Sequence, residues 1–152
     1  MEEFVGTLAV GGTGTLHSCY LGYFECFNSQ RYYEAHDVLE HLWLQEGREA
    51  SDYAYYKGLI QLAGGFVHLK LHHTQPEHPK HGRRLSPARR LFLLAAANLS
   101  PYAPHHLGLE MKHPLSLART MADQLEREDA MNPWSPSTAP LLPLPKIVPT
   151  AT

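Results

Sequence analysis

His36 and Glu40 are the two residues whose types and spacing most strongly suggest chemistry. They lie one helical turn apart in the stretch 27–43, which has the periodicity of an amphipathic helix. On a helical wheel both fall inside the apolar arc bounded by Tyr33 and Trp43, and not on the polar face. A buried carboxylate costs several kcal/mol unless it is paired or protonated. We therefore expect another part of the fold to supply partners for this pair.

The run 53–70 is the expected source of those partners. It is apolar nearly all round, apart from one narrow polar stripe made by Lys57, Gln61 and His68. Glycines at 58, 64 and 65 lie in or beside this stripe, and each costs about 1 kcal/mol relative to Ala in a helix. Such glycines indicate the close approach of a neighbouring helix or of a ligand.

The short connection from Gly47 to Asp52 predicts that these two helices are antiparallel neighbours. In that arrangement we expect an ion pair between Glu40 and Lys57. We also expect a hydrogen-bonded row of His36, Gln61 and His68. The predicted polar cluster thus lies between the two central helices and comprises His36, Glu40, Trp43, Lys57, Gln61 and His68.

Three classes of function fit this cluster. The first is a satisfied polar network that fixes helix packing, or that binds a small ligand. The second is an enzyme of the hydrolase type, with Glu40 or His36 as general base or with His36, Glu40 and His68 around a divalent metal ion. His-Glu-x-x-His and Glu-x-x-His signatures are absent, and a lysine beside Glu40 would repel a cation, so no cofactor is expected with certainty.

The third class is a homodimeric protein-interaction module. Arginines at 83, 84, 89 and 90 cluster near one predicted helix start, where an anionic ligand or an acidic partner surface would fit. A net charge of −2 argues against nucleic acid as the partner. The chain has no apolar run long enough to span a membrane and no basic leader before an apolar segment, so we expect a cytoplasmic protein.

The elements that must position these residues are all helical. Helices are predicted over 17–27, 30–46, 53–70, 86–99 and 115–128, with Ser29, either Ser51 or Asp52, and Ser86 as N-caps. We expect a compact all-α bundle of four to five helices over residues 17–131, after a flexible Gly-rich leader at 1–16. The proline-rich tail at 132–152 is either extended across the body or a neighbouring subunit, or disordered. Cys19 and Cys26, seven residues apart, are expected to be free buried thiols.

Two blocks of the sequence resemble a known family. The residues Phe27-Asn28, 33–40 and Trp43, together with the block 56–63, are similar to the domain of unknown function 309 family, over roughly residues 18–100. The acid after His36 is often Glu in that family and is Asp37 here. The resemblance implies a compact helical bundle, and no established activity comes with it.

Overall fold

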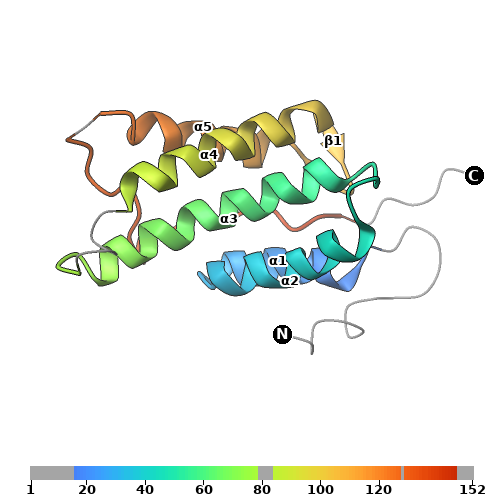
Figure 1. The fold of residues 1–152 in the computed structure, drawn as a ribbon, viewed down its shortest axis with the longest axis horizontal. Helices are drawn as coiled ribbons and strands as arrows, with labels where there is room; N and C mark the ends of the chain where they lie inside the picture. Colours follow the sequence, from blue (N-terminus) through green and yellow to red (C-terminus); the bar gives the residue numbers. More distant parts are fainter. Residues whose placement is uncertain (1–15, 79–83, 128, 147–152) are drawn as a thin grey trace, which may run out of the picture.

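The computed structural model describes residues 16–78, 84–127 and 129–146, so most of the predicted leader at 1–16 lies outside it. Figure 1 shows a helical bundle, which confirms the predicted all-α class. Within the described ranges the helices are α1 (Ser18–Asn28), α2 (Tyr32–Glu46), α3 (Tyr53–Thr74), α4 (Leu85–Leu99) and α5 (Lys112–Gln124). A 3-10 turn, η3 (Ser100–Tyr102), leads into a small antiparallel ribbon of β1 (His105–His106) and β2 (Leu109–Glu110).

The long helix α3 is the centre of the bundle. Figure 1 shows α1 and α2 on one side of it and α4 and α5 on the other. This placement explains why α3 is apolar nearly all round, because a helix covered on both sides buries most of its circumference. Leu59, Leu62 and Phe66 are fully buried in the common core.

Two glycines of α3 allow α4 to lie unusually close. A Cβ atom on Gly65 would stand 2.5 Å from Cε1 of Phe92, and one on Gly58 would stand 2.7 Å from Cγ of Leu99. Atoms cannot approach to such distances, so these positions require glycine in the present packing. The expectation that the α3 glycines mark a neighbouring helix is confirmed at these two sites.

Buried tyrosines attach α1 to α3. Tyr23 is fully buried and its hydroxyl donates to the carbonyl of Leu59 at 2.6 Å. The hydroxyl of Tyr20 donates to the Leu107 carbonyl at 3.0 Å, and it lies 2.6 Å from the hydroxyl of Tyr55. Because Tyr20 has a single hydroxyl proton, the Tyr55 hydroxyl must be the donor of that second bond. The row connects α1, α3 and the turn between the two short strands.

The described part of the tail, 132–146, is extended and packs across the body (Figure 1). The Asn132 amide donates to the Leu69 carbonyl at 2.8 Å, and Trp134 is 3% exposed with its Nε1 donating to the hydroxyl of Tyr32 at 3.0 Å. Asn28 makes two hydrogen bonds of 2.8 Å with the backbone of Leu142. These contacts make the described residues 132–146 a strap over the body.

Several predicted helix ends need correction. Ser29 does not cap α2: its hydroxyl donates back to the Glu25 carbonyl at 2.9 Å, and Arg31 occupies the N-cap without a side-chain bond. Asp52 precedes α3 but also makes no capping bond. The third helix continues to Thr74, α4 begins at Leu85 and α5 covers Lys112–Gln124. The ends of helices are the part of a helix that sequence signals define least well.

The two cysteines are free and buried, as expected. Burial raises the pKa of both thiols, so neither has the thiolate character of a reactive cysteine. Leu94 on α4, by contrast, is an apolar residue that is 49% exposed.

Candidate functional site

A cavity of about 410 Å³ opens between α2, α3 and α4. All members of the predicted polar cluster line it, namely His36, Glu40 and Trp43 from α2 and Lys57, Gln61 and His68 from α3. The remaining lining residues are mostly apolar and include Ile60, Gly64, Val67 and Leu91. The structure thus brings the predicted residues together around one space.

The predicted pairing of these residues is nevertheless wrong. Glu40 Oε2 lies 3.6 Å from His36 Nε2 on its own helix, and within the described ranges it makes no ion pair with Lys57. The two side chains are 37% and 33% exposed, so the carboxylate is not in the interior. The edge of α2 that carries them faces the groove between helices, where water reaches both groups and the desolvation cost is small.

Gln61 and His68 on α3 take their partners from α4 and its N-cap residue, and not from α2. Asn98 Nδ2 donates to Gln61 Oε1 at 2.7 Å, and Arg84 Nη1 lies 3.0 Å from His68 Nδ1. The predicted row of His36, Gln61 and His68 is therefore not formed. Sequence reasoning missed Asn98 and gave Arg84 a different role, in the arginine cluster, because nothing in the α4 pattern indicated which polar residues would face α3.

The partner of His68 determines its protonation. Guanidinium nitrogens only donate, so Nδ1 of His68 accepts and the ring proton is on Nε2. Burial lowers the pKa of His68, and the positive charges of Arg84 and Arg90 lower it further. His68 is consequently neutral at pH 7, and its Nε2–H remains available as a hydrogen-bond donor because Arg84 bonds to Nδ1.

Trp43 carries a second donor of interest. Its ring packs on Tyr53 with centroids 5.0 Å apart, and its side chain lines the cavity. Its Nε1 is buried and has no hydrogen-bond partner among the residues that the structure describes. A buried N–H without a partner is costly, so a bound acceptor at this place would be favourable.

The candidate metal ligands do not converge. Across residues 16–78, 84–127 and 129–146, no three His, Cys, Asp or Glu side chains are placed so that they could hold one ion. His36 and Glu40 form a pair, while His68 is turned toward Arg84. A cationic neighbour of this kind disfavours a metal ion at that imidazole.

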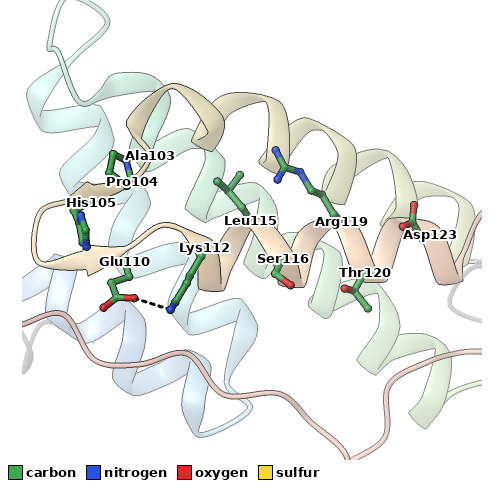
Figure 2. Close-up of a pocket in the computed structure, with 10 residues that line it drawn as sticks. All are labelled: Ala103, Pro104, His105, Glu110, Lys112, Leu115, Ser116, Arg119, Thr120 and Asp123. Carbon is green, nitrogen blue, oxygen red and sulfur yellow. Dashed lines mark ion pairs between the residues drawn. The ribbon is translucent and has the colours of Figure 1, made fainter.

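A larger hollow of about 700 Å³ lies along α5 and the short ribbon (Figure 2). Its polar side chains are spread along the helix, with Arg119 and Asp123 far from the Glu110–Lys112 ion pair of 3.3 Å. Lys112 and Glu110 are 74% and 51% exposed. Because its polar groups are solvated and do not converge, this hollow is a weaker candidate than the smaller cavity.

A comparison with family models gives a match for part of the chain. Residues 20–76 match the family described as Domain of unknown function (DUF309). This part of the chain is similar to that family. It spans α1 to α3 and contains every member of the predicted cluster, whereas Arg84, Leu91 and Asn98 lie outside it. The family description assigns no activity.

Two other comparisons, with curated proteins and with solved structures, found no match. Among the described helices, none combines the length and the apolar character needed to cross a bilayer. The cavity formed by the matched region and α4 is therefore the feature on which a function can be proposed.

Proposed function

We propose that this protein binds a small amphipathic molecule in the cavity between α2, α3 and α4. The molecule would lie with an apolar body on Ile60, Gly64, Val67 and Leu91, and with a carboxylate or similar acceptor facing Lys57. The observation that carries this proposal is an apolar-floored cavity in which hydrogen-bond donors outnumber acceptors.

The donors come from four side chains. Lys57 makes no ion pair within the described ranges, and Gln61 keeps its amide nitrogen because Asn98 uses only its oxygen. His68 presents Nε2–H, and Trp43 has the unsatisfied Nε1. Among the described residues that line the cavity, Glu40 is the one carboxylate, and His36 lies beside it. An anionic or carbonyl oxygen therefore fits this lining better than a cation does.

The volume is also suitable. Cavities that take small molecules measure about 300–1,000 Å³ and are mostly apolar with a few oriented polar groups. The present cavity, at about 410 Å³, is at the small end of that range. We therefore expect a ligand with a single ring or a short chain, bound with its polar end toward Lys57.

The other functions predicted for the cluster have weaker support. A network that fixes helix packing needs mutual bonds between the α2 and α3 side chains, and those residues bond elsewhere. A general-base enzyme would use Glu40 and His36 at the rim of the same cavity, but their separation of 3.6 Å is longer than a hydrogen bond. A hydrolase would in any case need the cavity to hold a substrate, so binding is the property to test first.

Competition between matched amphiphiles tests the proposal. Displacement of anilinonaphthalene sulfonate would be measured with decanoate and with decylamine, which share an apolar chain and differ in charge. We expect decanoate to bind more tightly, because Lys57 attracts its carboxylate. Lys57→Met should weaken decanoate binding about ten-fold and leave decylamine little changed.

Two further variants make this test specific. Lys112→Met removes an exposed lysine on α5, outside the cavity, and should bind decanoate like the wild type. Val67→Phe should weaken both ligands, because the larger ring occupies the cavity floor. If neither amphiphile binds saturably, or if the two lysine variants behave alike, the proposal is wrong.

A further inference from the structure

The face that contains the cavity is unusually apolar at its rim. Tyr33 and Leu44 on α2 are 66% and 65% exposed, and Leu94 on α4 is 49% exposed. Tyr33 lines the cavity, Leu44 follows Glu40 by one turn, and Leu94 follows Leu91 by three residues. The three side chains thus flank the groove above α3, and exposed apolar residues gathered in this way mark interaction surfaces.

The two walls of this groove carry opposite charge. On α2, which has no lysine or arginine, Glu40 lines the cavity and Asp37 follows the rim residue Tyr33 by one turn. On α4, which has no acid, Arg90 precedes the rim residue Leu94 by one turn. Figure 1 shows α2 and α4 running in the same direction, with α3 antiparallel between them. An acidic wall and a basic wall thus lie parallel on either side of one groove.

We propose that a second copy of this chain docks on the α2–α3–α4 face, related by a two-fold axis parallel to α3. Rotation about that axis places the acidic α2 of each copy opposite the basic α4 of its partner, twice in the dimer. A two-fold axis across the helices would instead place α2 on α2, where like charges repel. Closed symmetry needs a self-complementary surface, and this face meets that requirement.

The proposed dimer does not depend on ligand binding, but its formation would close the open side of the cavity. The cavity is open toward the same face, and pockets usually enclose most of a small ligand. In the dimer, the rim residues of the partner would cover the opening. A dimer that binds no amphiphile would leave this inference standing, whereas a monomer that binds decanoate would remove the dimer alone.

Sedimentation velocity over a concentration series, without added ligand, tests the docking face. We expect the wild type to show a monomer–dimer equilibrium. Leu94→Asp should raise the dimer dissociation constant about ten-fold or more, because it places a charge in the apolar contact. Leu93→Asp is the matched control: Leu93 is 45% exposed on the same helix but lies away from the cavity side, so its dissociation constant should not change.

Charge reversal tests the direction of the two-fold axis. Asp37→Arg and Arg90→Asp should each weaken the dimer, because each places like charges on facing walls. The double variant should recover much of the association, since both reversed walls again face opposite charge. Unchanged far-UV circular dichroism would establish that the variants fold. The proposal would be overturned by a wild type that is monomeric at all concentrations, or by equal changes in the dimer dissociation constant for Leu93→Asp and Leu94→Asp. It would also be overturned by a double variant that dimerises more weakly than both single variants.

Discussion

His68 shows how one neighbour decides the chemistry of a residue. Its position on the polar stripe of α3 was predicted, but its charge state follows from Arg84, which donates to Nδ1 at 3.0 Å. An imidazole that is half-buried beside a guanidinium favours its neutral form. The cavity therefore has a fixed N–H donor from His68 and not a second positive charge.

The lowered pKa of His68 makes stability depend on pH. Below the ordinary histidine pKa of 6.5 the unfolded chain binds a proton that the folded chain resists, so the free energy of unfolding falls as the pH drops. Between about pH 7 and about pH 5, urea unfolding should show a smaller loss for His68→Gln than for the wild type. Glutamine keeps an acceptor for Arg84 and does not titrate.

An exposed histidine on α2 provides the control for this experiment. His41→Gln should lose stability with falling pH as the wild type does, because His41 contacts neither Arg84 nor the cavity. If His68→Gln and the wild type gave parallel curves, the proposed neutral imidazole would be wrong.

At the level of elements, the close contact of α3 and α4 depends on where glycine occurs. Gly65 faces the ring of Phe92, and Gly58 faces Leu99. Gly64, one residue away from Gly65, faces only the end of Leu91, and a Cβ there would lie 3.2 Å from Cδ1 of that side chain. The three glycines therefore differ in how much room each one has.

Alanine substitutions should separate these glycines. Gly65→Ala should lower the free energy of unfolding, because overpacking costs about 1–3 kcal/mol and exceeds the ~1 kcal/mol that alanine adds in helix propensity. Gly64→Ala should be neutral or stabilising by up to about 1 kcal/mol, since Leu91 borders the cavity and can rotate away. Chemical denaturation of both variants measures the difference. Equal stabilities would mean that the α3–α4 contact is looser than the structure shows.

At the scale of the whole molecule, the strap connects parts that are distant in the sequence. Trp134 packs edge-to-face on Tyr32, with ring centroids 6.1 Å apart. Further along the strap, the Asn28 amide donates a hydrogen bond to the Leu142 carbonyl. The strap also reaches the turn between β1 and β2, where the Lys146 amide donates to the Gly108 carbonyl at 2.9 Å. Residues outside the matched region 20–76 thus help to hold its first helices in place.

Removal of the tryptophan side chain should show how much the strap contributes. Trp134→Ala should destabilise the protein by about 3–5 kcal/mol, because it leaves a large cavity and removes the bond to Tyr32. Leu141→Ala, at a strap residue that is 69% exposed, should change stability by less than about 0.5 kcal/mol. Urea unfolding of both variants measures this contrast. A small effect at Trp134 would mean that the strap is not part of the cooperative fold.

Apolar periodicity, glycines and turn signals were enough to predict an all-α bundle of four to five helices, and the residues of the predicted polar cluster all line one cavity. These features follow from which face of each helix must leave water, and that is written in the local spacing of residues. The predicted partners were wrong because a side chain on a helix edge can reach either of two neighbouring helices. The packing of α4 against Gly58 and Gly65 decided that Gln61 and His68 bond to Asn98 and Arg84, and left Glu40 in partial contact with water.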